Sequence, residues 1–424
     1  MRIMIFEPAY QGHYFVYLKH MLPELIELVG ARQVVLQTSD PALTSVEMKT
    51  LIAPIAGGID VRGGIPEQWQ TSGAAGSARR TDEMLRAARD ARAEHLIIPA
   101  ADGIGHSLAL RRGRSGGVPA GVTSEGLFMQ GTFLYPRTSM SDRVRQRLKW
   151  EIGRRAPFTY MHHLDPAVYE WERARARDRT RFGERWSLMP DPIEPPRGLS
   201  KLEARRELGV PEDGRLIGCA GVIDLRKGCD LMVRAFARAN LSATDRLVIV
   251  GPHKPEMRGL LEGEFRPLLA SGRLISIDRL LRPDELADSL SAMDLVCTPY
   301  PSHSGSASIV IRAAATPRPV LGSNFAWLGR TIPTFNLGWT CDVRDPEAFA
   351  LAMGRALEDA EAWRPTGAGR RFVEFHDYRN FKLCASRGTR QLMGLPAHGS
   401  QRNWEWVLEA VEASAPGRER SGVR

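Results

Sequence analysis

The sequence predicts an α/β protein made of two doubly wound domains. Short apolar runs alternate with amphipathic segments almost throughout, which is the pattern of parallel strands covered by helices. This alternation falls into two series, and a proline-containing stretch separates them. The 424 residues also exceed what one ordinary hydrophobic core holds, so two domains of average size are expected.

The first series begins with an apolar strand at 2–8 and an amphipathic helix at 14–28. After it we expect strands at 33–39, 94–100, 119–126 and 158–165, a glycine-rich loop after 39, and helices at 78–93 and from 103 onward. The strand runs are short and apolar, whereas the helical segments repeat apolar residues every three or four positions. The run at 158–165 is expected to be the last strand of this half.

The second series starts near residue 215. We expect strands at 215–223, 246–252, 273–280, 294–301 and 318–324, and helices at 229–239, at 283–293 and after the small-residue loop 302–308. The prolines of SLMPDPIEPPRGLS (187–200) cannot continue either kind of element, so this stretch is predicted to link the domains. The expected boundaries are 1–186 and 201–370 for the two domains, 371–414 for C-terminal helices packing back toward the first domain, and 415–424 for a frayed tail.

The location of a site follows from this topology. Ligands of open parallel sheets sit beyond the carboxyl ends of the strands. Two such domains joined by a linker are expected to face each other across a cleft lined by those ends. The loops expected there are 10–14, 101–106, 124–126, 221–228, 252–254 and 302–308.

Composition indicates a cytoplasmic protein. The sequence has no apolar run of transmembrane length and no evident signal peptide. Its five cysteines are scattered without a C-x-x-C, so reduced thiols are expected and a zinc site is not.

The formal net charge of +9 is partly local, since several arginines and a lysine lie within 137–155. This basic stretch is either a solvated helix face or a surface for anionic lipid or another acidic partner, which would place the protein at the inner face of a membrane. Nucleic acid is not expected, because no recognised binding motif accompanies the charge.

The most specific motif is GVIDLRKGCDLMVRAFARA (221–239), a strand end, a turn and an amphipathic helix. Arg226 and Lys227 lie on the turn, and Gly228 lets the backbone bend sharply. Two adjacent cations beside a helix N-terminus suit a diphosphate. The alternative is an ordinary exposed basic turn.

A strand followed by G-x-I-D-x-R-K-G and an amphipathic helix resembles the retaining GT-B glycosyltransferases of family 4. The segments 188–193, 246–252, 284–302 and 318–324 agree with that family in order and spacing, so the resemblance covers about 187–345 and is weaker over 1–185. It implies a GT-B fold with two Rossmann-like domains, the acceptor on the first and the nucleotide-sugar donor on the second. It also implies hexosyl transfer to a hydroxyl of a glycan, lipid-linked or small-molecule acceptor, with retention and without metal or another cofactor.

The resemblance gives the loop SHSGSAS (302–308) a role, because the family binds the donor's phosphates and sugar there. Small residues allow backbone N–H groups to approach an anion, and the following helix dipole adds attraction. The residues expected to bind the diphosphate are therefore Arg226, Lys227, Gly305, Ser306, Ala307 and Ser308, with Gly12 and His13 added from the first helix of the first domain. His253 and Lys254 match a position where family members often contact the nucleobase.

The chain departs from the family at the E-x7-E motif, where it has Ser304 and Arg312. The second glutamate of that motif normally accepts hydrogen bonds from the ribose hydroxyls. An arginine has no acceptor, so Arg312 cannot do this and would instead pair with phosphate or a neighbouring acid.

Glu125 and His106 are the catalytic candidates. The family often has a histidine where VTSEGL (122–127) has Ser124 and Glu125. Glu125 at a sheet edge either contacts the acceptor hydroxyl and steadies oxocarbenium-like charge or is a solvated loop acid. His106 and Asp102 lie on the next loop, where each is either structural or an acceptor contact.

Other functions are less well supported. The chain lacks the GxxxxGK[ST] loop of nucleotide hydrolases, the GxSxG of serine hydrolases and a D-x-D metal motif at a strand end. Two alternatives remain: a non-catalytic sugar-nucleotide or glycan-binding protein on the same scaffold, and a nucleotide-sugar epimerase.

Overall fold

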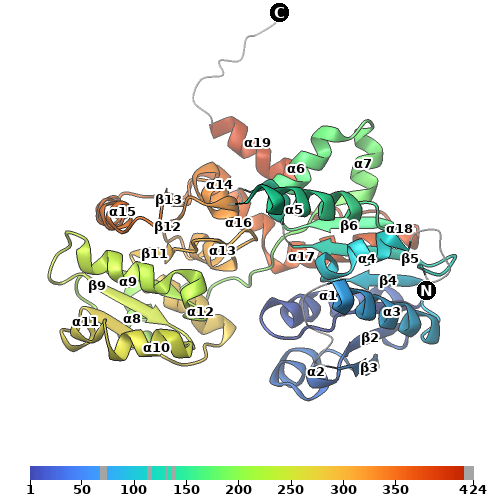
Figure 1. Cartoon of the computed structure of the whole chain (residues 1–424), viewed down its shortest axis with the longest axis horizontal. Coiled ribbons are helices and arrows are strands. Elements are labelled where there is room, and N and C mark those ends of the chain that lie inside the picture. The colour runs from blue at the N-terminus through green and yellow to red at the C-terminus, as the bar shows by residue number, and fades with distance from the viewer. Residues whose placement is uncertain (67–73, 112–116, 130, 136–138, 415–424) are drawn as a thin grey trace, which may run out of the picture. The chain divides into compact units, whose positions relative to one another are not determined.

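The computed structural model describes residues 1–66, 74–111, 117–129, 131–135 and 139–414. The chain divides into two compact units, each with its own parallel sheet (Figure 1). The first unit comprises Met1–Pro192 and Tyr378–Gln401, and the second comprises Ile193–Asp377 and Arg402–Arg424. The expected tail at 415–424 lies outside the described residues, as do positions 136–138 of the basic stretch.

The first unit is built on a seven-stranded sheet of order β3-β2-β1-β4-β5-β6-β7. Its strands are β1 (Ile3–Phe6), β2 (Val34–Ser39), β3 (Asp60–Ile65), β4 (His95–Ile98), β5 (Thr123–Phe128), β6 (Tyr160–His163) and β7 (Trp186–Leu188). Central β1 is parallel to both neighbours, and Ile3 pairs with Val34 on one side and with His95 on the other. Its four residues are buried, as expected for a strand covered on both faces.

Helices cover both faces of this sheet. They are α1 (His13–Val29), α2 (Asp40–Thr44), α3 (Ala74–Asp90), α4 (Gly105–Leu110), α5 (Met140–Gly153), α6 (Pro166–Arg175), α7 (Arg179–Arg185), α17 (Tyr378–Ala385) and α18 (Arg387–Leu392). The apolar stripe of α1, including Phe15, Leu18 and Leu22, packs on the sheet in one core with Phe381 of α17. On the other face of the sheet, α3 contacts α4, and α4 contacts α5.

The second unit has a six-stranded parallel sheet of order β10-β9-β8-β11-β12-β13. Its strands are β8 (Leu216–Ala220), β9 (Arg246–Val250), β10 (Leu274–Ile277), β11 (Leu295–Thr298), β12 (Val320–Ser323) and β13 (Gly338–Cys341). Its helices are α8 (Lys201–Leu208), α9 (Cys229–Arg238), α10 (Pro255–Glu262), α11 (Arg266–Ala270), α12 (Pro283–Ser291), α13 (Ser308–Ala315), α14 (Ala326–Thr334), α15 (Pro346–Asp359), α16 (Gly367–Phe375) and α19 (Trp404–Ser414).

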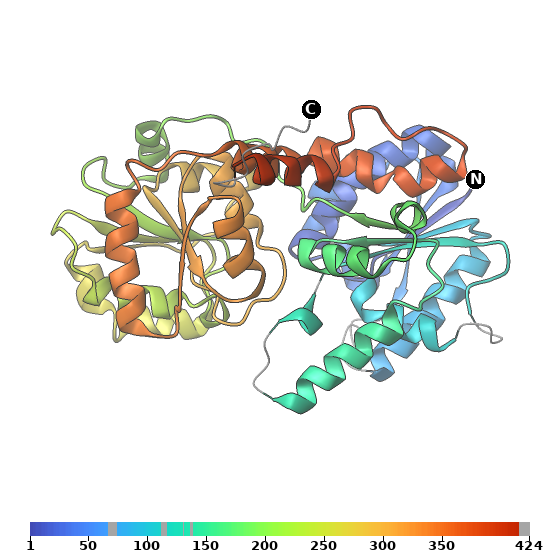
Figure 2. The same ribbon diagram turned by 90° about the horizontal axis from the view of Figure 1, so that it is seen from above.

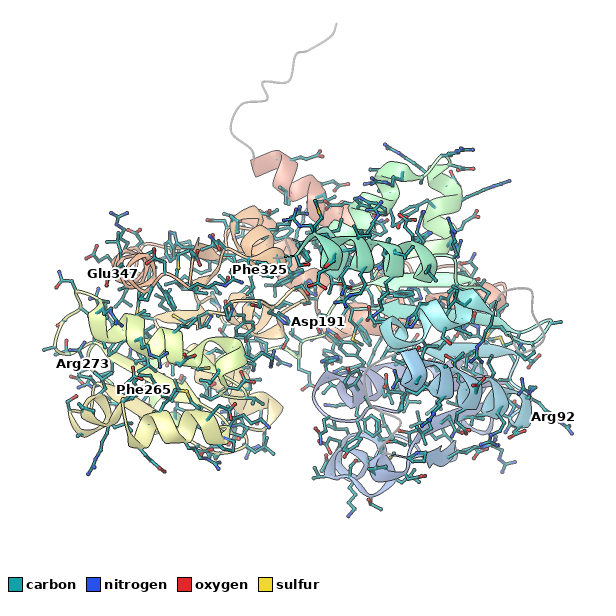
Figure 3. The ribbon with its side chains drawn as sticks, in the orientation of Figure 1. Arg92, Asp191, Phe265, Arg273, Phe325 and Glu347 are labelled. Carbon is teal, nitrogen blue, oxygen red and sulfur yellow. The ribbon has the colours of Figure 1, made fainter. Side chains whose placement is uncertain are left out.

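One core of the second unit joins α9, α10 and α15 to a face of the sheet. It includes Met232 and Phe236 of α9, Met257 of α10, and Phe349 and Met353 of α15, all fully or nearly fully buried. Phe265, labelled in Figure 3, belongs to the same core and precedes α11. Because α12 and α13 pack against each other and contact β8, β11 and β12, the sheet is covered on both faces.

The two doubly wound sheets confirm the predicted fold class, but three details of the first half were wrong. The predicted last strand, 158–165, is followed by β7, which pairs with it and occupies the start of the predicted linker. The sequence DVRGGI forms β3, which was missed because its glycines and charges hide an edge strand. Strand β5 runs from Thr123 to Phe128, two residues beyond the predicted end at 126.

Two further features concern the cysteines and the length of the helices. All five cysteines are free thiols in the structure, and four of them are buried. Within the described residues, no helix combines the length and apolar character needed to cross a bilayer.

Candidate functional site

The strand order of the second unit fixes where a ligand is expected. The order reverses between β8 and β11, and such a switch point opens a crevice beyond the carboxyl ends of the two strands. The segment that leaves β8 is the Arg-Lys turn, and the segment that leaves β11 is the small-residue loop. The fold therefore brings together in one unit the two motifs that the sequence predicted to bind a diphosphate.

The Arg-Lys turn is held by hydrogen bonds and by close packing. The carboxylate of Asp224 accepts a hydrogen bond from the backbone N–H of Lys227 at 2.8 Å, which closes a short 3-10 turn. Gly228 then adopts φ 70° and begins α9. A Cβ at Gly228 would lie 2.2 Å from the carbonyl oxygen of Pro299, so only glycine allows the turn to approach the loop after β11.

The two cations of the turn have different surroundings. The side chain of Arg226 is 63% exposed, with Nη2 lying 3.4 Å from the carboxylate of Asp224. Lys227 is half-buried, and its Nζ lies 5.9 Å from the ring centroid of Tyr300. Burial lowers the pKa of the Lys227 ammonium below its usual value of 10.5, although the nearby Cys229 and Asp224 act in the opposite direction. An anion bound beside Lys227 would stabilise the charged form of its ammonium group.

The small-residue loop ends at the N-terminus of α13. Nε2 of His303 lies 3.0 Å from the carbonyl oxygen of Ser306, so the imidazole donates a hydrogen bond that holds the loop closed. Among the described residues, no side chain caps α13, whose first residue is Ser308. The backbone N–H groups of its first turn can therefore serve an anion, which the helix dipole favours. Buried Ile309, Val310 and Ile311 fix the helix on the sheet.

The other predicted nucleotide contacts lie at separate points of the second unit. His253 is buried, with Nδ1 2.6 Å from the carbonyl oxygen of Gly251 and Nε2 2.8 Å from the hydroxyl of Ser276, so its ring nitrogens serve the fold. Lys254 is exposed at the start of α10, and its backbone N–H donates to Ile223 of the Arg-Lys turn. Arg312 lies on α13 and is half-buried, whereas Ser304 lies in the loop before it.

A larger cavity in the second unit lies at the opposite edge of the sheet. It has a volume of about 540 Å³ and is lined by Arg215, Asp294 and Pro319, which directly precede β8, β11 and β12. Since ligands of parallel sheets bind at the carboxyl ends of the strands, this amino-terminal cavity is not the expected donor site.

In the first unit, the strand order reverses between β1 and β4. Gly12 and His13 lie after β1 at the start of α1, where Gly12 has φ 70°. Nε2 of His13 lies 3.2 Å from the sulfur of Met129, which follows β5, and the Met129 backbone N–H donates to the carboxylate of Asp102 at 2.7 Å. These contacts join the loops after β1, β4 and β5 at one edge of the sheet.

A pocket of about 250 Å³ lies beside this edge, which is roughly the volume of eight water molecules in the liquid. Its lining combines aromatic and polar side chains: Asp102, His106, Phe128, Thr132, Phe133, Gln146, Lys149 and Trp150, with Gly153. Phe133 stacks on Trp150 with ring centroids 4.6 Å apart, and Thr132 donates to the amide oxygen of Gln146. An apolar wall with a few converging polar groups is typical of a small-molecule site.

His106 has an unusual position in this pocket. Its Nδ1 is buried and has no hydrogen-bond partner among the described residues. Burial lowers the pKa of its imidazole, and the charges of Lys149 and Arg80 lower it further, so the ring is neutral at neutral pH. A neutral histidine that lines a polar pocket can exchange a proton or a hydrogen bond with a bound hydroxyl group.

Glu125 is not where the sequence predicted it. Because β5 continues to Phe128, Glu125 lies within the strand instead of at its carboxyl edge, and it is only 2% exposed. Its carboxylate lies 3.4 Å from Nε2 of His95 and 3.3 Å from Nε2 of His162. Burial alone would raise the pKa of Glu125, but the contacts with His162 and His95 outweigh it and lower the pKa to about 2. Glu125 is not among the described residues that line the pocket.

Glu7, which the sequence prediction missed, lies at the carboxyl end of β1. It is fully buried, and although Oε1 accepts a hydrogen bond from the Ala9 backbone, Oε2 has no partner among the described residues. Burial raises the pKa of this carboxyl from 4.5 to about 8, despite the hydrogen bond from Ala9. The sequence could have drawn attention to Glu7, because it is an acidic residue directly after the apolar strand that borders the switch point.

Comparison with known families matches residues 214–359 to the model described as "Glycosyl transferases group 1". The matched part begins just before β8 and ends with α15, so it contains the Arg-Lys turn, the small-residue loop and α13.

Curated relatives match a similar portion of the chain. A D-inositol 3-phosphate glycosyltransferase of Corynebacterium urealyticum is 30% identical over 165 residues, which is 37% of this chain and 38% of that protein. The chain thus matches about two-fifths of the length of this relative.

Solved structures extend the likeness to the fold of the whole chain. Sucrose-phosphate synthase from Thermosynechococcus elongatus aligns with a TM-score of 0.66 and 18% identity, covering 93% of this chain and all of that one. The Anabaena protein HepE in complex with UDP aligns with a TM-score of 0.62 and 13% identity, covering 93% and 100%. The chain therefore has the GT-B fold of two Rossmann-like units, and its residues 214–359 match the glycosyl transferases of group 1.

Proposed function

We propose that the protein is a glycosyltransferase of the retaining family 4 type. It moves a sugar from a nucleoside diphosphate sugar to an acceptor hydroxyl, without a metal ion or another cofactor. The donor binds the second unit and the acceptor binds the first.

One observation supports the donor site: Arg226 and Lys227 lie on a turn packed against the loop that leads to the N-terminus of α13, which no described side chain caps. Two cations and a set of backbone N–H groups at the same sheet edge provide what a diphosphate requires. They also neutralise the charge that develops on the diphosphate as it leaves, which is why a metal ion is not needed in this proposal.

The comparisons support this assignment. The group 1 match includes both the turn and the loop, and the curated relative is named as a glycosyltransferase. HepE, a protein of the same fold, was solved in complex with UDP. We therefore propose UDP, ahead of other nucleoside diphosphates, as the first ligand to test.

For the acceptor, we propose the pocket of the first unit. Its volume of about 250 Å³ fits a small polar group, such as one sugar ring of a glycan, a lipid-linked acceptor or a small polyol. His106 and Asp102 are the groups placed to hydrogen-bond the acceptor, while Lys149 adds a positive charge. Gly12 and His13 start α1, where no described side chain caps the helix, so they remain candidates for a backbone contact with the donor's diphosphate.

The proposed chemistry uses these groups in order. The bond between the anomeric carbon and the diphosphate oxygen breaks as Arg226, Lys227 and the N–H groups of α13 stabilise the leaving diphosphate. The acceptor oxygen attacks from the same face, and its proton passes to the departing phosphate oxygen. Configuration at the anomeric carbon is thereby retained.

A second candidate is favoured by Ser304 and Arg312, which stand where the family has glutamates. A protein with these substitutions that binds the nucleotide sugar without transferring it would show donor affinity but no turnover. The half-buried guanidinium of Arg312 on α13 offers only donors, so the ribose hydroxyls need another acceptor in either case.

We also propose that the enzyme is cytoplasmic, with its basic stretch at 137–155 contacting an anionic membrane from the inner side. The net charge of +9 supports attraction to such a surface.

The decisive experiment is calorimetric titration of the full chain with UDP, GDP, dTDP and ADP in the presence of a chelator. We expect one nucleotide to bind, and Arg226→Ala/Lys227→Ala to weaken its binding at least tenfold. An exposed arginine outside the turn provides the control, because Arg266→Ala on α11 should leave the affinity unchanged.

Transfer is then tested with the matching nucleotide sugar and a panel of hydroxyl acceptors, with the anomeric configuration of the product read by NMR. Donor binding without turnover for any acceptor would favour the binding protein over the enzyme. Equal affinity of the double variant and the native chain would overturn the donor site.

A further inference from the structure

Helix α5 carries a row of apolar side chains that point away from the protein. Met140, Val144 and Leu148 are 71%, 62% and 59% exposed. Residues four apart on an α-helix differ by only about 40° around its axis, so the three side chains form one stripe that spans roughly 12 Å. Figure 2 shows α5 running along the outside of the first unit.

This stripe is not needed to hold the helix in place. The other side of α5 is already packed through Trp150, which contacts Phe128 and Phe133 and donates its indole N–H to Glu172 at 2.9 Å. Ser139 also caps the start of the helix. An apolar row opposite an anchored face is a feature that folding alone does not explain.

The charge around the stripe identifies the partner. Residues 140–155 include six basic and two acidic residues, a formal net charge of +4. The basic residues are Arg143, Arg145, Arg147, Lys149, Arg154 and Arg155. Projected on the helix, Arg143 and Arg147 flank the stripe on one side and Arg145 flanks it on the other, whereas Lys149 turns toward the pocket of the first unit. Arg145 and Arg147 pair with Asp142 and Glu151 of the same helix, so the segment remains cationic overall.

We infer that α5 is a docking helix for an anionic lipid bilayer. It lies in the plane of the interface, with Met140, Val144 and Leu148 inserted among the acyl chains and the flanking cations on the lipid phosphates. This arrangement of an apolar face bordered by arginine and lysine is what an interfacial helix requires. A bilayer fits better than an acidic protein, because cations line both sides of one straight apolar row and lipid phosphates surround an inserted helix on both sides.

The inner face of the same helix lines the pocket of the first unit through Gln146, Lys149 and Trp150. Docking through the outer face therefore places this pocket next to lipid headgroups. If the proposed transferase function holds, the acceptor is a lipid-linked hydroxyl compound. The docking itself does not depend on that function.

The test is sedimentation of the full chain with vesicles made of equal parts of phosphatidylglycerol and phosphatidylcholine, without any substrate. We expect binding to these vesicles, little binding to pure phosphatidylcholine, and weaker binding as salt is raised. The variant Val144→Ser/Leu148→Ser should lose at least tenfold in affinity. The matched control is Leu280→Ser/Leu351→Ser, which removes two leucines of the second unit that are 78% and 56% exposed, and it should bind like the native chain.

Insertion is measured separately with Leu148→Trp, whose added fluorescence should be quenched by brominated lipids, whereas that of Leu280→Trp should not. Circular dichroism confirms that the variants fold. Equal binding of the stripe variant and the control, equal binding to neutral vesicles, or no binding to anionic vesicles would each overturn the inference. The last result would leave an acidic protein as the partner for this face.

Discussion

The α-carbon of Gly228 lies so close to Pro299 that a Cβ on it would be 2.2 Å from the Pro299 carbonyl oxygen. This contact ties the Arg-Lys turn after β8 to the loop after β11. Gly228 also has φ 70°, a conformation that other residues adopt at a cost. The two motifs proposed to hold the diphosphate are thus joined at a point where only glycine fits.

We expect Gly228→Ala to weaken both folding and nucleotide binding. The left-handed backbone alone costs about 1–2 kcal/mol for alanine, and displacement of Pro299 adds to this. Gly209→Ala is the matched control, because Gly209 has φ 72° but no atom within 4 Å of a Cβ. Urea unfolding and UDP titration of both variants measure the difference. Equal losses of stability and affinity would show that the contact with Pro299 is unimportant.

The affinity for UDP should fall with rising pH because of Lys227. Its half-buried ammonium has a pKa below the usual 10.5, so the cation is lost at a lower pH than in an exposed lysine. Lys227→Arg keeps a guanidinium that does not titrate in this range. Calorimetry between neutral and alkaline pH should show a steeper fall for the native chain than for this variant, and the comparison removes the titration of UDP itself. Parallel curves would rule out Lys227 as the titrating contact.

Glu7 should make the first unit less stable as pH rises. Its carboxyl has a pKa of about 8 in the folded state against 4.5 ordinarily, so between these values the folded chain keeps a proton that the unfolded chain releases. Folding stability therefore declines by ~1.4 kcal/mol for each pH unit in this window. Glu7→Gln should remove this decline, whereas Glu27→Gln, at an exposed position on α1, should retain it. Urea unfolding at pH 5, 6.5 and 8, in roughly equal steps within the titration window, provides the measurement.

Gly388 of α18 covers the buried carboxylate of Glu125, since a Cβ at this position would lie 2.1 Å from Oε2. We expect Gly388→Ala to lower the melting temperature. Gly183→Ala on α7 should raise it, because nothing lies within 4 Å of a Cβ there and alanine favours a helix by up to ~1 kcal/mol. Differential scanning calorimetry distinguishes the two signs. A gain of stability in both variants would show that α18 does not press on Glu125.

Acid should destabilise the same cluster. The contacts of Glu125 with His162 and His95 hold the pKa of its carboxyl at about 2, below its unfolded value of 4.5. This contribution to stability is present above pH 4.5 and is lost as pH falls toward 2. Glu125→Gln should therefore unfold with a weaker dependence on pH in this range. An unchanged acid transition in urea titrations would place the sensitive group elsewhere.

The sequence was sufficient for the fold class and for placing the Arg-Lys turn directly after a strand of the second unit, because parallel strands there are continuous apolar runs. It was weaker where strands are short or polar. The glycines of β3 and the three residues of β7 carry little periodic signal, and their pairing depends on neighbours distant in sequence.

Side-chain environment was the main source of error at the site. Glu125 was expected at the carboxyl edge of its strand because the end of that strand was placed two residues too early, and the two histidines that surround it come from β4 and β6. The pocket was not predictable either, since Trp150 and Phe128 are distant in sequence and meet only when α5 packs on the sheet. His106, a candidate chosen from topology, lines that pocket, and its catalytic role stays a prediction.

The course of the chain has a practical consequence. The main chain passes from one unit to the other after residues 192, 377 and 401. Tyr17 of α1 packs on Phe381 of α17 with ring centroids 5.3 Å apart, and it donates a hydrogen bond to Asp191, which Figure 3 labels. A protein truncated after residue 192 or after residue 377 would therefore lack α17, and the apolar face of α1 would be exposed. To express the first unit alone, residue 192 should be joined to residue 378 by a short designed peptide that replaces the second unit.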